Sequence, residues 1–551
     1  MAAVATMTRL SALLLACTLA ASDARADTYP RQPGVDVQHY AFTLELSDDH
    51  DRVAGVAVIE VRFTRDGESA LRFDLASRDG ATGKGMAVSG VTADGAPLAY
   101  SHRDHVLAIT LPQPSRQGQR LRVQVTYAGE PATGLRIANN RHGDRTFFSD
   151  NWPNRARHWL PTVDHISDKA TAEMIVVAPA HYQVISNGLL AEETDLPGGR
   201  RRTHWRQSVP IAPWLYVLGV ARFAVQHVDT FEGKAIQTWV YAQDRDAGFH
   251  DFAVPTRAAL EYYSDKVGPF AYEKLANVQS NSVSGGMEAA SAIFYSESSV
   301  TGDRSERWRN VIIHEVAHQW FGNAVTESDW DDVWLSEGFA TYFTLLFIEH
   351  AYGRDEFLRG LASSRERILA FDRDNPDYRV VHDNLDDMSK VTTGQTYQKG
   401  GWVLHMLRGL VGDEMFWTGI RSYYRAHMNG HATTADFREH MERASGRDLR
   451  AFFDQWLTRG GLVRLSGDWQ HDAGAGAVTI RLTQTETARL FTMPIQVAVY
   501  AAGSAVPSIT TVEVSGPTHE FRIAAGSKPD RVVLDPNHLV LMEASFAERP
   551  R

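Results

Sequence analysis

Residues 311–342 constrain this chain more than any other stretch. They read VIIHEVAHQWFGNAVTESDWDDVWLSEGFATY, a mostly apolar segment with a few ionisable side chains. His314 and His318 are four residues apart, so in a helix both imidazoles project from one face. The apolar residues around them predict a buried helix, and buried ionisable groups require partners. The stretch therefore predicts a helix whose two histidines share a function.

Glu337 supplies the third member of a predicted metal site. It stands just before a second helical pattern, residues 338–350. Two neutral imidazoles and one carboxylate form the ligand set of a catalytic Zn²⁺, whose fourth position stays open for water. Glu315 is on the first helix but offset from the histidines, so it can act on that water as a general base. The alternative is a helix that carries two histidines by chance. The presence of Glu337 favours the metal site over this alternative.

Length and composition are those of a globular multidomain protein. The chain has 551 residues, of which 43% are hydrophobic and 22% charged. This predicts three or four domains that each bury a core. The formal net charge of −11 argues against a nucleic-acid partner. We expect no transmembrane segment, because the longest apolar run is too short to span a bilayer.

Residues 1–26 are predicted to be a signal peptide. Arg9 precedes an apolar run at 10–21, and Ala-Arg-Ala at 24–26 has the small-x-small pattern of a cleavage site. Cleavage there predicts an exported chain, periplasmic or secreted, that begins at Asp27. The alternative is a lipoprotein anchored through Cys17, which follows Leu-Leu-Ala. Cys17 is the only cysteine, so disulfides and cysteine ligands are excluded from the mature protein.

Sequence periodicity divides the rest of the chain into three predicted domains. Period-two runs at 40–46, 57–63, 107–111 and 121–127 predict an N-terminal antiparallel β domain, 27–224. Its aperiodic segment 148–169 suits a loop held against a neighbouring domain or a purely structural loop. Helical periodicity from about Pro255 predicts an α-rich catalytic domain, 225–460, with a helix near 258–267 and a solvated loop at 371–388. Short strands then predict a C-terminal β-sandwich, 461–545. The predicted fold class is multidomain α+β.

Two further segments place functional groups beside the metal helix. Gly285, Gly286, Met287 and Glu288 follow a predicted strand, 275–279. Paired glycines let a backbone approach a ligand closely, and a strand edge there can pair with a peptide. Tyr397 stands at the head of a predicted helix, where its phenol can donate to a developing oxyanion. Each signal is weak alone, since most glycine pairs are turns and most single tyrosines only pack.

Together these residues resemble one family, the gluzincin aminopeptidases related to aminopeptidase N and leukotriene hydrolase. The family pattern G-x-M-E-N, H-E-x-x-H, a later Glu and Tyr-x-Lys-Gly is matched in order. The match extends from about 151 to 457 and is weaker in both β regions. It implies a thermolysin-like catalytic domain with one Zn²⁺ per chain. The implied metal ligands are His314, His318 and Glu337. The implied catalytic residues are Glu315, which activates the water, and Tyr397, which stabilises the oxyanion.

The resemblance also implies a substrate class. Gly285 and Gly286 would hold the substrate backbone beside Met287, and Glu288 would bind a free α-ammonium. A carboxylate fixed one residue from the scissile bond favours an N-terminal charge that internal peptide bonds lack. The expected substrates are peptides with a free N-terminus, and the expected activity is that of an aminopeptidase.

The chain departs from the family pattern in three ways. Ala289 replaces the usual Asn, and Trp152 stands where members place a second amine ligand. Asp150 therefore either takes over amine binding or favours a basic first residue, and on both hypotheses its removal raises KM. The large helical C-terminal domain of many relatives does not follow the predicted β-sandwich, which predicts an open cleft with weak selection by peptide length.

Three other functions remain open from the sequence. An endopeptidase with the same zinc chemistry would cleave N-acetylated peptides equally well, and Glu288 argues against it. An epoxide hydrolase is disfavoured because a domain that shapes its pocket is not found. A non-catalytic surface binding protein would not need an intact site, yet all the catalytic positions are present. The sequence does not determine the preferred first residue, the physiological substrate or the oligomeric state.

Overall fold

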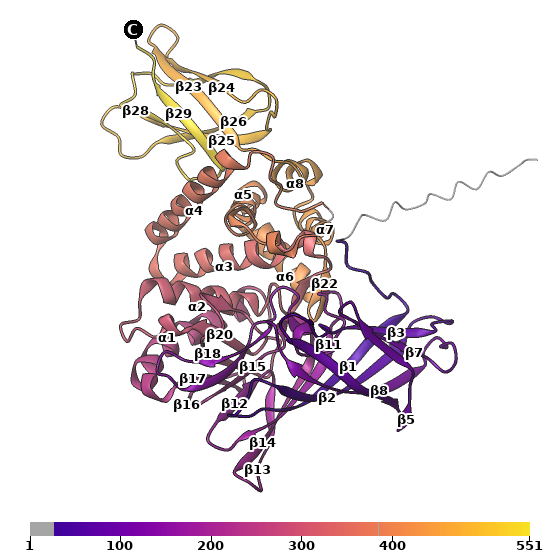
Figure 1. Cartoon of the computed structure of the whole chain (residues 1–551). Coiled ribbons are helices and arrows are strands. Elements are labelled where there is room, and N and C mark those ends of the chain that lie inside the picture. Colours follow the sequence, from indigo (N-terminus) through magenta and orange to yellow (C-terminus); the bar gives the residue numbers. More distant parts are fainter. Residues whose placement is uncertain (1–26, 384, 551) are drawn as a thin grey trace, which may run out of the picture.

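A computed structural model describes residues 27–383 and 385–550. A β-rich N-terminal region, a helical middle and a C-terminal group of strands follow one another along the molecule in Figure 1. The predicted signal peptide, with Cys17, lies outside the described residues. Within the described part, no helix has the length and apolar character needed to cross a membrane.

The N-terminal region is built on an eight-stranded sheet with the order β13-β14-β11-β1-β2-β8-β4-β5. Alternate residues of β2 (Val53–Phe63) and β8 (Arg120–Glu130) are buried, as the period-two pattern predicts. The other strand pairs of this sheet are antiparallel, as predicted, but β1 (Val35–Glu45) departs from that prediction and pairs in parallel with β11 (Ala170–Pro179). Many residues separate these two strands, and such a long connection permits either direction.

Two smaller sheets, β12-β15-β10-β9 and β3-β7-β6, complete this region. Its remaining strands are β3 (Ala70–Asp74), β4 (Gly85–Ala93), β5 (Ala96–Pro97), β6 (Tyr100–Arg103), β7 (Val106–Thr110), β9 (Leu135–Asn139), β10 (Arg145–Ser149), β12 (Gln183–Ser186), β13 (Leu189–Leu196), β14 (Arg200–Ile211) and β15 (Leu218–Ala221).

The loop at 148–169 lies against the helical region, which confirms one of the two interpretations of its composition. Lys169 Nζ donates to the backbone oxygens of Asn323, Ala324 and Gly430 at 2.9, 3.0 and 2.8 Å. These three oxygens belong to segments that flank the metal helix and a later helix. The N-terminal region is therefore attached to the segments that build the site.

A five-stranded sheet, β16-β17-β18-β20-β19, opens the helical region. Its strands are β16 (Phe223–Phe231), β17 (Lys234–Tyr241), β18 (Lys274–Ser280), β19 (Gly286–Met287) and β20 (Ala292–Ser296). The predicted strand at 275–279 is thus confirmed as β18. β19 lies at the edge of the sheet, and no other strand of residues 27–383 and 385–550 pairs with its outer side.

The helix expected near 258–267 begins earlier than its periodicity suggests. α1 (Arg245–Lys266) contains Pro255 in its interior. Its first turns carry Gly248, where a Cβ would lie 2.5 Å from Val240 Cγ1. Close packing on β17, rather than an apolar pattern, therefore holds this part of the helix.

The helices around the site are α2 (Glu306–His318), α3 (Trp334–Tyr352), α4 (Arg354–Asp374) and α5 (Gly400–Val411). α4 extends four residues into the predicted solvated loop at 371–388, and the rest of that segment is mostly irregular. The region also contains α6 (Asp413–His427), α7 (Thr434–Ser445), α8 (Arg450–Leu457), β21 (Val325–Glu327) and β22 (Gly430–Ala432).

The C-terminal strands form two sheets, β27-β24-β23-β29 and β26-β25-β28, at the far end of the molecule in Figure 1. They are joined to the helices by Arg464, whose Nη2 lies 2.6 Å from Asp372 Oδ2 of α4. The strands are β23 (Val463–Asp472), β24 (Ala477–Gln484), β25 (Met493–Tyr500), β26 (Ser508–Val514), β27 (Thr518–Ala524), β28 (Arg531–Leu534) and β29 (Met542–Glu548).

Candidate zinc site

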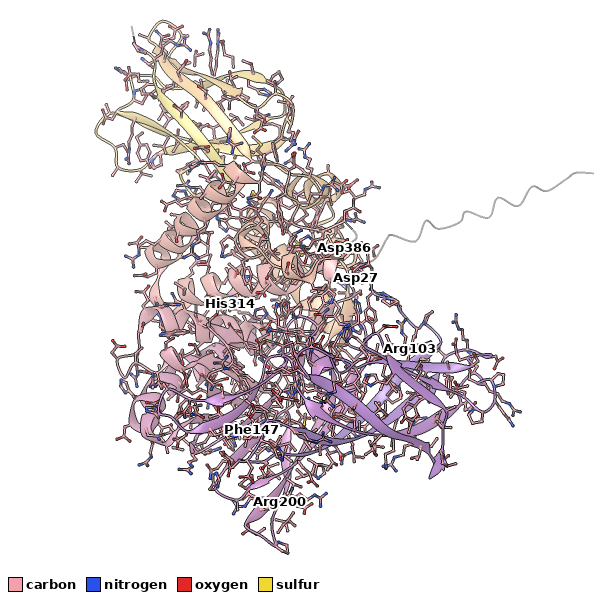
Figure 2. The ribbon with its side chains drawn as sticks, in the orientation of Figure 1. Asp27, Arg103, Phe147, Arg200, His314 and Asp386 are labelled. Carbon is pink, nitrogen blue, oxygen red and sulfur yellow. The ribbon has the colours of Figure 1, made fainter. Side chains whose placement is uncertain are left out.

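Three side chains from two helices converge in the helical middle of the molecule, where Figure 2 labels His314. His314 and His318 come from α2, and Glu337 comes from the first turn of α3. The two histidine Nε2 atoms are 3.0 Å apart. Glu337 Oε2 lies 3.5 Å from His314 Nε2 and 3.2 Å from His318 Nε2. The structure thus brings together the three residues predicted as metal ligands.

The charges around these three residues favour a bound cation. Glu337 Oε2 is buried and has no donor in hydrogen-bonding geometry among the described residues. Burial alone would lower the pKa of His318, but the carboxylates of Glu288, Glu337 and Glu315 outweigh it and raise this pKa to about 10. The carboxylates therefore require positive charge at this point. Two imidazole nitrogens and a carboxylate oxygen directed at one position fit Zn²⁺.

His318 is oriented by contacts to its other ring nitrogen. Its Nδ1 lies 3.1 Å from the backbone oxygen of Phe321 and 3.1 Å from Ser336 Oγ. An Nδ1–H that donates to the Phe321 carbonyl leaves Nε2 free to bind a metal. Gly322 permits this contact, because a Cβ there would lie 2.2 Å from Ser336 Oγ and its φ is +104°. The sequence interpretation missed Ser336 and Phe321, for which Gly322 was the available signal.

Glu315 faces the cluster from beneath the edge strand β19. A Cβ on Gly286 would lie 2.2 Å from Glu315 Oε1, whereas a Cβ on Gly285 would meet nothing within 4 Å. Gly286 therefore makes room for the carboxylate, and Gly285 does not. Burial, reinforced by the carboxylate of Glu288, raises the pKa of Glu315 well above its ordinary value. A carboxylate of this kind can accept a proton and later return it.

Tyr397 reaches the cluster from a single π-helical turn, η7 (Gln395–Lys399), directly before α5. Its ring centroid is 6.1 Å from that of His314. The position follows from a close contact between α3 and α5, since a Cβ on Gly338 would lie 2.9 Å from Gly400 Cα. Gly338 adjoins the third ligand and Gly400 is three residues beyond Tyr397. The expected helix head is thus a π turn, a geometry frequent at functional sites.

Glu288 joins this group as a further buried carboxylate. Ligand atoms of Glu288, Glu315 and His318 lie within 4.8 Å of one another. The Glu288 backbone oxygen accepts hydrogen bonds from Gln319 Nε2 at 2.9 Å and Asn323 Nδ2 at 2.6 Å. Burial raises the pKa of Glu288 to about 7. The residues that follow H-E-x-x-H therefore position the backbone of Glu288 beside the metal ligands.

A cavity of about 440 Å³ lies between Glu288, Tyr397 and the N-terminal region. Met287, Gly285 and Gly286 line it, together with Asp150 and Trp152. Trp152 packs edge-on against Trp214 and Trp330, with ring centroids 4.9 and 5.1 Å apart. Ala289, which replaces the family Asn, is buried. All the substrate-binding candidates therefore surround one cavity.

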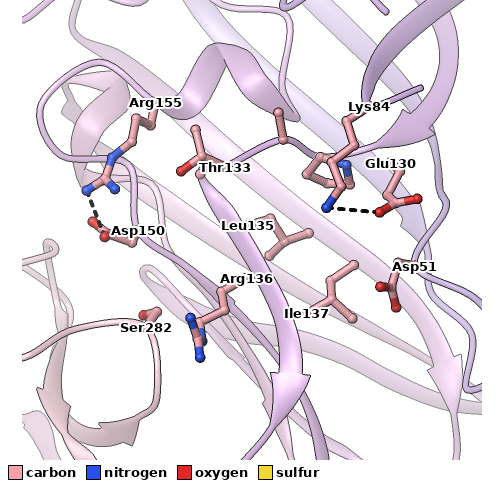
Figure 3. A pocket seen from close by; sticks show the side chains of 13 residues that line it. Asp51, Lys84, Glu130, Thr133, Leu135, Arg136, Ile137, Asp150, Arg155 and Ser282 are labelled. Atoms are coloured by element: carbon pink, nitrogen blue, oxygen red, sulfur yellow. Dashed lines mark ion pairs between the residues drawn. The ribbon is translucent and has the colours of Figure 1, made fainter. Parts of the chain in front are cut away.

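Asp150 has a partner that the sequence did not indicate. Its Oδ2 lies 2.7 Å from Arg155 Nη2, as Figure 3 shows for the adjoining pocket. Arg136 lines both that pocket and the cavity beside Glu288. Arg155 therefore balances the charge of Asp150. This argues against both hypotheses about Asp150, amine binding and a preference for a basic first residue, because each uses an unpaired carboxylate.

Two family models match the chain. The peptidase family M1 domain matches residues 254–456, and the peptidase M1 N-terminal domain matches residues 36–215. The chain belongs to peptidase family M1. This confirms the resemblance drawn from the motifs, since both family domains are found in order.

Relatives within family M1 include glutamyl aminopeptidase of Bos taurus, 29% identical over 335 residues that cover 58% of this chain and 35% of that protein. Probable aminopeptidase 2 of Sulfurisphaera tokodaii is 27% identical over 319 residues, which cover 56% of this chain and 40% of that protein. The chain thus spans well under half the length of these relatives.

A solved M1 zinc metallopeptidase from Deinococcus radiodurans has a similar fold, with a TM-score of 0.64 and 25% identity. The likeness covers 77% of this chain and 93% of that one. Family membership implies a catalytic Zn²⁺, and His314, His318 and Glu337 are the described residues that fit it.

Proposed function

We propose that this chain is a zinc aminopeptidase that removes the first residue from peptides. Glu288 carries the proposal. It is a buried carboxylate beside the metal ligands, and no lysine or arginine pairs with it in residues 27–383 and 385–550. A bound divalent cation would balance two of the three carboxylates Glu288, Glu315 and Glu337. The α-ammonium of a peptide would balance the third.

The site residues have separate tasks in this reaction. A bound zinc ion would polarise the scissile carbonyl and make water a stronger nucleophile. Glu315 would accept a proton from the attacking water and deliver it to the departing amine. Tyr397 would donate its O–H to the carbonyl oxygen as negative charge develops there. Edge strand β19, whose outer side pairs with no other described strand, would hold the peptide in an extended conformation.

Three finer features belong to the same proposal. The enzyme is exported, periplasmic or secreted, after cleavage following Ala26, with the lipid anchor at Cys17 as the alternative. The helical region is a thermolysin-like catalytic domain. The two C-terminal sheets pack as a β-sandwich, which is supported by the burial of Val478 and Ile480 on one face of β24 and of Ile495 and Val497 on one face of β25.

A panel of aminoacyl fluorogenic substrates with chelator controls tests the activity. We expect hydrolysis of substrates with a free amine, loss of activity on chelation and recovery on addition of zinc. N-acetylated substrates should be cleaved only at a slow background rate. Equal cleavage of acetylated substrates would favour an endopeptidase, and inactivity of the zinc-loaded protein would favour a non-catalytic binding protein.

Gly286→Ala should lower kcat by about 100-fold, because the new methyl group displaces the Glu315 carboxylate. Gly90→Ala, in strand β4 away from the site, is the matched control, since its methyl group also enters open space. Steady-state kinetics and zinc content of both variants check this. Unchanged kcat in Gly286→Ala would show that Glu315 does not need its present position.

Arg136 supports a preference for acidic first residues. It lines the cavity beside Glu288 and forms no ion pair within the described part of the chain. Several relatives are glutamyl aminopeptidases. A guanidinium at this wall of the cavity would pair with a substrate side-chain carboxylate.

Arg136→Ala should lower kcat/KM for a glutamyl substrate by about tenfold or more and leave that for an alanyl substrate nearly unchanged. Arg103→Ala, on a strand away from the site in Figure 2, is the control for lost surface charge. Equal losses on both substrates would remove Arg136 from first-residue recognition.

A further inference from the structure

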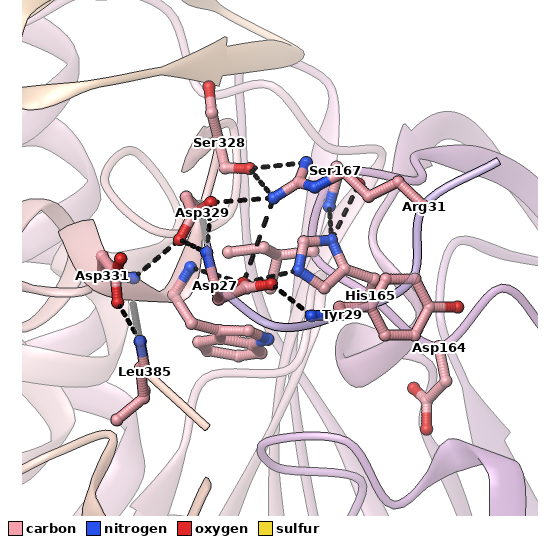
Figure 4. A network of polar contacts seen from close by, with 12 residues as sticks. Asp27, Tyr29, Arg31, Asp164, His165, Ser167, Ser328, Asp329, Asp331 and Leu385 are labelled. Atoms are coloured by element: carbon pink, nitrogen blue, oxygen red, sulfur yellow. Dashed lines mark hydrogen bonds and ion pairs between the residues drawn. The ribbon is translucent and has the colours of Figure 1, made fainter. Parts of the chain in front are cut away.

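Asp27, the residue after the predicted cleavage site, is buried between the N-terminal and helical regions. It is 8% exposed, and Figure 4 shows it at the centre of a polar network. Its backbone nitrogen lies 3.0 Å from Oδ1 and 3.0 Å from Oδ2 of Asp329. Its own carboxylate accepts from His165 Nε2 at 2.8 Å and from the Trp330 backbone N–H at 3.2 Å. Asp27 therefore connects two distant parts of the chain.

The two equal distances to Asp329 suit an ammonium group better than an amide. A peptide N–H has one hydrogen, which two carboxylate oxygens would have to share. An α-ammonium has three hydrogens and can donate a separate charge-assisted bond to each oxygen. The Asp27 nitrogen is thus placed where it can donate one hydrogen bond to each carboxylate oxygen of Asp329.

The surrounding charges also favour an added cation. Asp329 lies near the carboxylates of Asp27 and Asp331, and among the described residues the guanidinium of Arg31 pairs with it. Arg31 Nη2 is 2.9 Å from Asp329 Oδ2, but the Arg31 side chain is one-third exposed. Burial, reinforced by the neighbouring carboxylates, raises the pKa of Asp329. A further positive charge beside Asp329 would stabilise its ionised form.

Asp329 also precedes η5 (Trp330–Asp332), the short turn that leads into the helix carrying Glu337. The Asp329 side chain accepts from the Asp331 N–H at 3.0 Å and so caps η5. η5 leads through Val333 into α3 and Glu337. Interactions that fix the Asp329 side chain therefore also stabilise the start of α3.

We propose that the α-ammonium of mature Asp27 forms a buried ion pair with Asp329 and thereby fastens the segment that enters α3. Hydrolysis breaks the C–N bond between Ala26 and Asp27, leaving a carboxylate on Ala26 and an amine on Asp27. This amine takes up a proton at neutral pH. The proposal rests on the export and cleavage proposed above. Removal of the leader is then a step that completes the folded protein.

Chains with defined N-termini test the ion pair. One begins at Asp27 and the other at Ala26, which converts the ammonium of Asp27 into an amide and changes no side chain. Each is made with Asp329 and with Asp329→Asn. We expect Asp329→Asn to lower Tm by about 3–5 °C more in the chain that begins at Asp27. Equal losses in both chains would overturn the proposal.

A second measurement does not depend on the Asp329 variant. An aldehyde reagent selective for N-terminal amines should modify the folded chain that begins at Asp27 at least about tenfold more slowly than the chain that begins at Ala26. Equal rates would overturn the ion pair. Mass spectrometry of the exported protein tests the cleavage separately, and a mature N-terminus other than Asp27 would overturn the proposed processing. Neither result depends on aminopeptidase activity.

Discussion

Replacing Glu315 with glutamine should abolish nearly all hydrolysis while the protein keeps its metal. The amide has almost the shape of the carboxylate but cannot accept the proton of the attacking water. We expect kcat to fall by at least about 10³-fold, which corresponds to roughly 4 kcal/mol of lost transition-state stabilisation. Steady-state kinetics with a free-amine substrate and elemental analysis of zinc give the two readouts.

Glu306→Gln is the matched control for this variant, because Glu306 is on the exposed first turn of the same helix. It should retain both activity and zinc. If Glu315→Gln loses its metal, Glu315 contributes to binding the ion rather than to proton transfer. If Glu315→Gln remains active, another group acts as the base.

Replacing Glu288 with glutamine should remove the distinction between free and blocked N-termini. A substrate ammonium would then lack its buried counter-charge, and breaking such a pair costs about 3–5 kcal/mol. We expect kcat/KM for a free-amine substrate to fall by about 10²- to 10³-fold. The slow background rate on its N-acetylated analogue should not fall. The ratio of the two rate constants is the decisive measurement.

Asp150→Asn is the informative comparison for Glu288. Because Asp150 is paired with Arg155, its loss should affect free-amine substrates much less than the loss of Glu288. A larger effect at Asp150 would restore the hypothesis that it binds the substrate amine. Equal losses on free and acetylated substrates in Glu288→Gln would assign Glu288 a structural role and favour an endopeptidase.

The metal ligands were predictable because the information is local. Helical spacing alone places His314 and His318 on one face, and Glu337 belongs to a recognisable second helix. The family pattern added Tyr397, whose approach to the cluster depends on the contact between Gly338 and Gly400. That contact joins two helices whose packing no periodicity reveals.

The remaining features depend on contacts between distant segments. The pairing of Asp150 with Arg155 requires the conformation of an aperiodic loop, and composition suggested only that this loop packs on a neighbour. The parallel pairing of β1 with β11 depends on the path of a long connection. Gly286 was recognised as a site for backbone approach, but its role in accommodating Glu315 appears only when β19 lies over α2.

The burial of Asp27 has a consequence for an enzyme population at high concentration. Every copy of an aminopeptidase has a free N-terminus, which is the group that other copies recognise in their substrates. On our proposal, a mature terminus paired with Asp329 would be withheld from them. The folded state would thereby protect the proposed aminopeptidase from being shortened by other copies, and local opening around Asp27 would set the rate at which that protection is lost.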